Sequence, residues 1–188
     1  LGVPFLSVLL GDVWRALSPW RALADGFVWA WERTGRDARP LAAYPAGWGR
    51  WPGAVAIFAF SALELAYADP ASPRALALGI ALYTYVALFG FALFGRETWS
   101  ARGEGFAVLF GLLARIAPLA VRDRRLVVRW PLTGLAGAEP VPGSTVFLAV
   151  MLGTVGFDGF SRARFWQDLL ADVEGPYVLD DPGLAELL

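Results

Sequence analysis

The chain of 188 residues contains no cysteine, no histidine, no lysine and no asparagine. The lack of cysteine excludes disulfides, thiolate metal ligands and thiol catalysis within this stretch. The lack of histidine also excludes a typical zinc site and a Ser-His-Asp triad. No Walker A loop or glycine-rich dinucleotide motif is present. A hydrolytic enzyme built on this chain would therefore need groups from outside this stretch.

Charge is also scarce, at 18% of residues, and it is balanced. The 16 basic residues are all arginine, and with 17 acidic residues they give a net charge of −1. Such a chain offers no basic field to nucleic acid. The arginine preference, together with abundant Ala, Gly, Val, Leu and Pro, is typical of high-GC bacterial genomes. Because the chain starts at Leu1 and stops abruptly at Leu188, we expect it to be a piece of a longer protein.

Apolar residues make up 57% of the chain, and the mean hydropathy is +0.51. The run from Ala75 to Gly95 holds no charge, proline, asparagine or glutamine. As a helix it would be about 31 Å long, which matches the hydrocarbon thickness of a bilayer. Hydrocarbon offers no hydrogen-bond partners, and such a helix pairs its own backbone N–H and C=O groups. The sequence therefore predicts an integral membrane protein.

The fold class we expect is an all-α helical bundle of four to five transmembrane helices plus an interfacial amphipathic helix. That helix lies in the Trp- and Arg-rich segment 11–50, over Val13 to Glu32, either continuous or broken at Ser18-Pro19. A loop over 122–143, with a short extended piece at 126–132, and a polar tail over 161–188 with a helix at 163–173 complete the chain. The predicted spans cover 1–10 (partial), 52–68, 75–95, 105–121 and 144–160.

All nine tryptophans lie outside the predicted spans. Indole side chains prefer the headgroup level, so this distribution favours a membrane protein over a water-soluble bundle. If the chain crosses the membrane at each predicted span, then segments 11–50, 96–104 and the tail lie on one side and carry ten arginines. The other side carries five arginines, at 74, 122, 124, 125 and 129. The positive-inside rule then places the first group in the cytoplasm. We expect a multi-pass protein of the bacterial plasma membrane.

Three ionisable residues, Glu64, Arg115 and Asp158, fall within predicted spans and form the candidate intramembrane polar site. Helix rise puts Glu64 and Arg115 at similar depth, which predicts an ion pair between them. That pair could be a staple of the bundle or a functional site, or each side chain could reach the interface separately. Asp158 lies nearer the opposite side, where a helix-end position is the simpler interpretation. Pro118 should distort the fourth span and free a carbonyl near Ala114, so that Arg115 lines a polar pocket.

Four motifs resemble, in order and spacing, a family of actinobacterial polytopic membrane proteins commonly labelled fenitrothion hydrolase. They are GDVWRALSPWR at 11–21, GRWP at 49–52, FGLLARIAPL at 110–119 and FDGFS at 157–161. The resemblance covers residues 11 to 166 and implies cleavage of organophosphate triesters. It assigns no catalytic residues to this chain.

Three function classes stay open: a membrane-bound hydrolase, a small-molecule or ion permease using Arg115 and Glu64, and a non-catalytic membrane subunit. The expected partners are the lipid bilayer and the remainder of the same chain, with self-association left open. We assign no cofactor and no metal site, since the carboxylates that could bind Mg²⁺ or Ca²⁺ are dispersed in depth.

Overall fold

The computed structural model describes residues 2–65, 72–122, 125–137 and 140–174. Of the described residues, 73% are helical. It divides into two units, residues 1–150 and 151–188, which are considered separately. The described elements are α1 (Gly2–Leu10), α2 (Trp14–Leu17), α3 (Pro19–Glu32), the 3₁₀ turn η1 (Ala46–Trp48), α4 (Trp51–Leu65), α5 (Pro73–Phe94), α6 (Arg96–Arg102), α7 (Gly105–Ala114), β1 (Leu119–Arg122), β2 (Arg125–Val128), α8 (Thr133–Ala136), α9 (Ser144–Ser161) and α10 (Arg164–Glu174).

The amphipathic segment near the N-terminus forms two helices, α2 and α3, with the break at Ser18-Pro19. Pro19 occupies the first helical position of α3, where its missing N–H costs no hydrogen bond. The Ser18 hydroxyl accepts a hydrogen bond from the Arg21 N–H at 3.3 Å and so caps the helix. Of the two alternatives that the sequence left open, the broken form is the one adopted.

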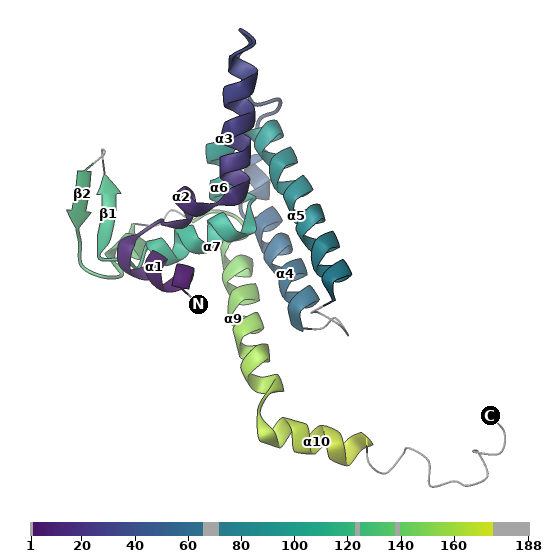
Figure 1. The fold of residues 1–188 in the computed structure, drawn as a ribbon. Helices are drawn as coiled ribbons and strands as arrows, with labels where there is room; N and C mark the ends of the chain where they lie inside the picture. Colours follow the sequence, from purple (N-terminus) through teal and green to yellow (C-terminus); the bar gives the residue numbers. More distant parts are fainter. Residues whose placement is uncertain (1, 66–71, 123–124, 138–139, 175–188) are drawn as a thin grey trace, which may run out of the picture. The chain divides into compact units, whose positions relative to one another are not determined.

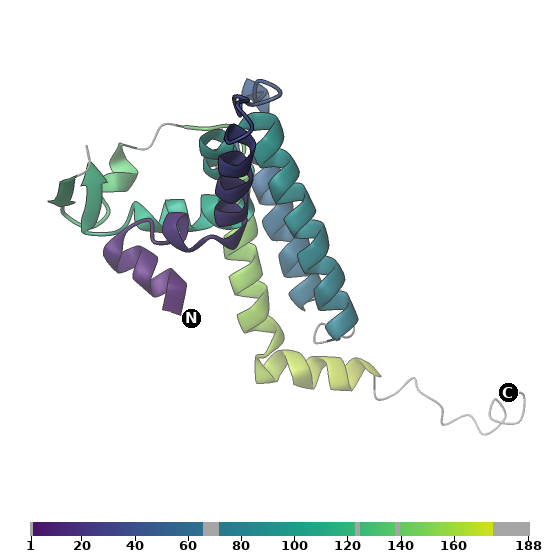
Figure 2. The same ribbon diagram turned by 45° about the horizontal axis from the view of Figure 1, so that its top comes forward.

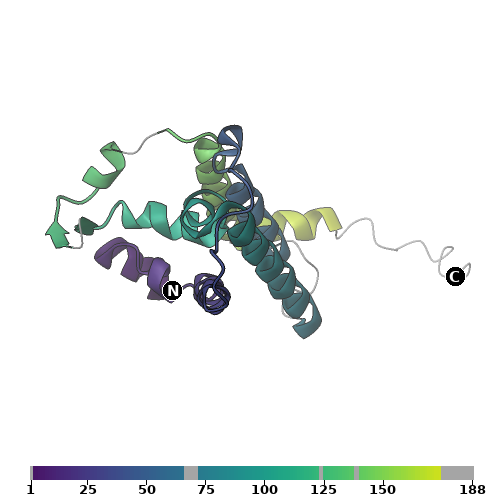
Figure 3. The same cartoon turned by 90° about the horizontal axis from the view of Figure 1, so that it is seen from above.

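Helix α5 packs against α3 on one side and α6 on another (Figures 1 and 3). The buried cluster between them consists of Ala24 from α3, Ala87 and Phe91 from α5, and Trp99 from α6. Gly90 is required here, since a Cβ at that position would overlap the indole of Trp99. The glycine lets the indole lie flat on the backbone of α5.

Two helices of the described chain are long and apolar enough to cross a membrane, α5 and α9. Only 17% and 6% of their apolar stretches are buried by the rest of the protein. The core helix of a water-soluble protein would be mostly buried instead. Helices α4 and α7 are also apolar but shorter, with 15 and 10 residues.

The prediction of a spanning helix over 105–121 is wrong. Helix α7 ends at Ala114, and Leu119–Arg122 forms the strand β1, paired antiparallel with β2. Pro118 explains the difference, because its ring disfavours helical geometry at Ala117 and it has no N–H for the next turn. The ten residues of α7 rise only about 15 Å, half of a bilayer's hydrocarbon core.

Helix α7 runs across the direction of α4 and α5 rather than alongside them (Figures 1 and 2). It meets α4 near the beginning of both helices, where Gly105 lies against Ile57 and Gly53 against Val108. Helix α1, predicted as the end of a span, packs on α7 and β1.

The segments 11–50 and 122–143, predicted to lie on opposite sides of the membrane, meet in the structure. The Arg50 N–H donates to the carbonyl of Pro142 at 2.6 Å. The Arg50 side chain also donates to the hydroxyl of Ser144, at the start of α9. Because α7 does not carry the chain to the far end of α4, the residues just before α9 lie beside the beginning of α4.

The second unit holds the later turns of α9 and the helix α10, which confirms the helix predicted at 163–173. The two helices are joined through Phe160, which packs on Phe165 and Trp166. Part of the predicted polar tail, 175–188, lies outside the described residues.

Candidate functional site

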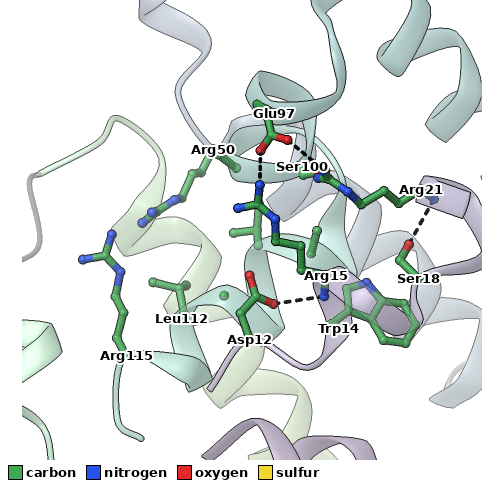
Figure 4. A pocket seen from close by; sticks show the side chains of 14 residues that line it. Asp12, Trp14, Arg15, Ser18, Arg21, Arg50, Glu97, Ser100, Leu112 and Arg115 are labelled. Atoms are coloured by element: carbon green, nitrogen blue, oxygen red, sulfur yellow. Dashed lines mark hydrogen bonds and ion pairs between the residues drawn. The ribbon is translucent and has the colours of Figure 1, made fainter. Parts of the chain in front are cut away.

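An open pocket of about 180 Å³ lies in the first unit, where α2, α3, α6, α7 and the residue before α4 converge (Figure 4). We call it the cationic pocket, because four arginines and two carboxylates line it. Its apolar base comes from α7. The lining residues are Asp12, Trp14, Arg15, Ser18, Arg21, Arg50, Glu97, Ser100, Ala101, Ala107, Val108, Gly111, Leu112 and Arg115.

The short helix α2 and the break after it position the first wall of the pocket. The Asp12 carboxylate accepts a hydrogen bond from the Arg15 N–H at 3.1 Å, which fixes the start of α2. Gly11 has a φ of 95°, and an added Cβ would lie 3.1 Å from the Leu119 carbonyl oxygen. The tight turn at Gly11 therefore brings Asp12 to the pocket beside the end of α7.

Glu97 on α6 forms ion pairs with two of the four arginines. Its carboxylate lies 2.9 Å from the Arg15 guanidinium and forms a second ion pair with Arg21. Arg21 also donates to the Ser100 hydroxyl at 3.4 Å and lies 4.0 Å from Asp25 in its own helix. These interactions hold Arg15 and Arg21 against α6 and offset part of their positive charge.

Arg50 and Arg115 have no such compensation. Their guanidinium groups are directed toward one another across the pocket (Figure 4). Arg50 donates to the Ser144 hydroxyl at 3.0 Å, and Arg115 donates to the Gly134 carbonyl at 3.4 Å. Among the described residues, neither guanidinium forms an ion pair with a carboxylate.

The Arg50 side chain is only partly exposed, and its Nε is buried without a hydrogen-bond partner. Burial lowers the pKa of the Arg50 guanidinium below its usual value, and the positive charges of Arg115 and Arg102 lower it further. A guanidinium stays protonated at neutral pH even so. The pocket therefore retains a positive charge that the described side chains leave unbalanced.

A second polar cluster lies next to the pocket, around Glu104 at the N-cap of α7. The Glu104 side chain is 2% exposed and accepts hydrogen bonds from the N–H groups of Phe106 (3.0 Å) and Ala107 (2.8 Å). It also accepts from the Tyr83 hydroxyl and, at 3.5 Å, from the Trp14 indole. Burial raises the pKa of this carboxyl, although the hydrogen bonds oppose the rise.

Of the three residues predicted as a polar site, only Arg115 lines the pocket. Glu64 is exposed, near the end of α4 that points away from α7, so the predicted Glu64–Arg115 ion pair is absent among the described contacts. The depth argument assumed two parallel spans, whereas α7 crosses α4. Asp158 pairs with Arg162 one turn along the chain, at 2.8 Å.

The Ala114 carbonyl, which Pro118 is predicted to free, accepts from the Ala117 N–H at 3.2 Å and from an arginine other than Arg115. Arg129, just after β2, donates to the carbonyls of Ala114 (2.8 Å), Arg115 (3.1 Å) and Ala117 (2.9 Å). Because Arg129 satisfies the end of α7, the Arg115 side chain is left to face the pocket.

The prediction missed Arg15, Arg21, Arg50 and Glu97, because it considered only charges inside the predicted spans. For the three arginines the available signal is the crowding of arginine and tryptophan in 11–50, which equally fits a membrane-surface segment; no comparable signal marks Glu97. No group of three or more acidic, histidine or cysteine residues that could hold a metal ion occurs in the described part of the chain.

Comparisons with protein-family models, curated proteins and solved structures found no match to this chain.

Proposed function

We propose that the chain is a polytopic integral membrane protein of the bacterial plasma membrane that binds a small negatively charged ligand in the cationic pocket. One observation carries the ligand proposal: four arginines from separate parts of the sequence converge on one pocket that offers only two carboxylates. Bringing guanidinium groups together costs electrostatic energy, and a bound anion repays it.

The membrane assignment is supported by the surface of α5. Large apolar side chains project from it on several faces, among them Leu78, Ile80 and Leu82, each more than 60% exposed. Such a surface in water would drive aggregation, whereas in hydrocarbon it is solvated. Tryptophans on α3 and at the beginning of α4 are likewise exposed, at positions suited to the headgroup level.

For the described residues we propose three crossings, α4, α5 and α9, rather than the four to five expected from sequence; α7 lies across the direction of α4 and α5. The ends where α4 and α9 begin then lie on the pocket side. That side holds twelve described arginines, against Arg74, Arg162 and Arg164 on the other. By the positive-inside rule the pocket side is cytoplasmic. The twelve are Arg15, Arg21, Arg33, Arg36, Arg39, Arg50, Arg96, Arg102, Arg115, Arg122, Arg125 and Arg129.

Thiol labelling tests the proposal cleanly, because the chain has no cysteine of its own. Ser100→Cys is a near-isosteric change in the pocket wall, and Leu82→Cys lies on the exposed face of α5. In membranes, Ser100→Cys should react with a water-soluble methanethiosulfonate, while Leu82→Cys should not. The anionic sulfonatoethyl reagent should react with Ser100→Cys on the order of tenfold faster than its cationic trimethylammonium analogue, because the pocket is positive.

Equal rates for the two reagents would contradict a cationic binding pocket. Rapid labelling of Leu82→Cys in intact membranes would contradict the placement of α5 in lipid. Ala43→Cys, exposed in the segment before α4, gives the reference rate for a thiol in open water.

Hydrolysis of a phosphoester is a second candidate, suggested by the resemblance to the fenitrothion hydrolase family. The supporting observation is that Asp12 places a carboxylate in the same pocket as the arginines, the arrangement a general base needs. Membranes carrying the protein should then release nitrophenol from a nitrophenyl phosphotriester, and Asp12→Asn should abolish the release. Binding without turnover would leave the permease and the non-catalytic subunit as the alternatives.

A further inference from the structure

We propose that Arg50 and Arg115 together bind a single phosphate group, either the headgroup phosphate of an anionic lipid or free phosphate in solution. This inference rests on the proposed function, since it names the ligand of the same cationic pocket. It assigns binding to two of the four arginines and gives the other two a structural role.

This assignment of roles follows from the interactions that the four arginines already form in the structure. Arg15 and Arg21 share the Glu97 carboxylate and are held by it against α6. A ligand would have to compete with that ion pair to engage either of them. Arg50 and Arg115 contact only neutral oxygens among the described residues, those of Ser144 and Gly134.

Arg50 carries a guanidinium donor that no described group accepts. Its Nη1 donates to the Ser144 hydroxyl, while its Nε is buried and has no partner. A buried donor without a partner is costly. Because the Nε is shielded from solvent, the Arg50 side chain would shift toward the pocket on binding an oxyanion, and the pair of parallel hydrogen bonds that arginine forms with an oxyanion would then remove that cost.

The opposed arrangement of the two guanidinium groups favours phosphate over a carboxylate. A carboxylate has two oxygens in one plane and pairs with one fork. A tetrahedral phosphate has oxygens pointing in several directions, so it can bridge two forks that face each other across a pocket (Figure 4).

The position of the pocket explains why a lipid headgroup is one of the two sources. Arg50 precedes the first residue of α4 and contacts the first residue of α9, so it lies where both apolar helices begin. In a bilayer this is the level of the phosphate groups. Free phosphate could reach the same place, because the pocket is open.

The test uses the full chain purified in dodecyl maltoside, a detergent without phosphate. The first arm titrates inorganic phosphate, with potassium chloride of equal ionic strength as the reference. The second arm adds phosphatidylglycerol to the micelles, with diacylglycerol as the phosphate-free reference lipid. Binding is measured by native mass spectrometry for the lipid and by the shift in unfolding temperature for both probes.

Arg50→Gln and Arg115→Gln should each weaken binding of the effective probe at least about tenfold, the effect of losing one charge-assisted contact. Arg15→Gln, which removes a paired arginine from the same pocket, should weaken binding clearly less than either of these changes, because the Glu97 carboxylate already offsets part of its charge. Arg39→Gln, on an exposed arginine paired with Asp37, controls for general surface charge. Arg115→Gln keeps the test valid if Arg50→Gln fails to fold, because it relieves repulsion and should unfold at the wild-type temperature or above without ligand.

Binding of inorganic phosphate that is lost in Arg50→Gln and Arg115→Gln would support the inference and identify a soluble source. Binding of phosphatidylglycerol but not of inorganic phosphate, lost in the same two variants, would support the inference and identify a lipid headgroup as the source. If neither probe distinguishes the wild type from these variants, or if Arg15→Gln weakens binding as strongly, the inference is wrong. Charge-selective labelling of Ser100→Cys would then leave the proposed function standing with another anion as its ligand.

Discussion

Glu104 is the most deeply buried charged residue of the described chain, and it lies at a junction of three helices. Its carboxylate caps α7 and accepts hydrogen bonds from Trp14 on α2 and Tyr83 on α5. No cation neutralises it among the described contacts. Its hydrogen bonds join α2, α5 and α7, and it is not among the residues that line the cationic pocket.

Glu104→Ala should lower the free energy of unfolding by about 2 kcal/mol, because it removes the cap and leaves the Tyr83 hydroxyl without its partner. Denaturant unfolding in detergent micelles measures the change. Asp37→Ala, on an exposed carboxylate, should change the stability by less than about 0.5 kcal/mol.

The raised pKa of Glu104 also predicts a pH dependence. A carboxyl that binds its proton more tightly in the folded than in the unfolded state stabilises the fold most at low pH. That contribution should decrease as pH rises from the ordinary value of 4.5 through the raised pKa. Glu104→Gln cannot titrate, so the stability of the wild type relative to Glu104→Gln should fall over this range. A difference that grows with pH would show that the hydrogen bonds outweigh burial.

At the residue scale the sequence identified Arg115 but not its companion Arg50. Arg115 was visible because it interrupts an apolar run. Arg50 lies between Trp and Gly residues in a polar segment, where nothing local distinguishes it from the surface arginines around it. Its burial depends on Pro142 and Ser144, more than ninety residues further along the chain. Such pairings are invisible to helix depth and periodicity.

At the scale of elements, the contact between α5 and α6 depends on two glycines that receive the Trp99 indole. A Cβ at Gly90 or Gly103 would overlap the ring. Gly90→Ala should therefore destabilise the protein by about 1–3 kcal/mol, because either the indole or α6 must move. Thermal unfolding gives the comparison.

Gly26→Ala is the matched control for that change. Gly26 is also inside a helix, α3, but nothing lies within 4 Å of an added Cβ. There the substitution should raise stability by about 0.5–1 kcal/mol, since alanine restricts the unfolded chain. Equal effects at both glycines would contradict the close packing of Trp99.

Elements were predictable where one local rule dominates. The apolar run at 75–95 became α5, Pro73–Phe94, and Ser18-Pro19 divided the N-terminal helix. The run at 105–121 does not form one helix, because the chain leaves helical geometry before Pro118, whereas the sequence prediction assumes that Pro118 only distorts a continuing helix. The β1–β2 hairpin is predicted only in part: the extended piece expected at 126–132 overlaps β2, whereas β1 lies in the run expected to span. The two strands are stabilised by pairing with each other, which a single segment does not reveal.

At the scale of the whole molecule, the proposed three crossings predict the sides of the membrane on which two segments lie. Ala43→Cys precedes α4 and Ala163→Cys follows α9, so they should lie on opposite sides. In intact cells an impermeant maleimide should label Ala163→Cys alone, and permeabilised cells should show both. Labelling of both thiols in intact cells would contradict an odd number of crossings between them.

The pocket draws its charged groups from Asp12 to Arg115, and its contact with α9 from Ser144. During synthesis, a ribosome that has released Arg50 must add dozens of further residues before Arg115 can face it. Chains that stop before Ser144 therefore carry Arg50 without its partners, and the proposed anion site needs the chain to reach at least that residue. A ligand that stabilises the pocket would consequently distinguish chains that include Ser144 from shorter ones, which remain accessible to proteases.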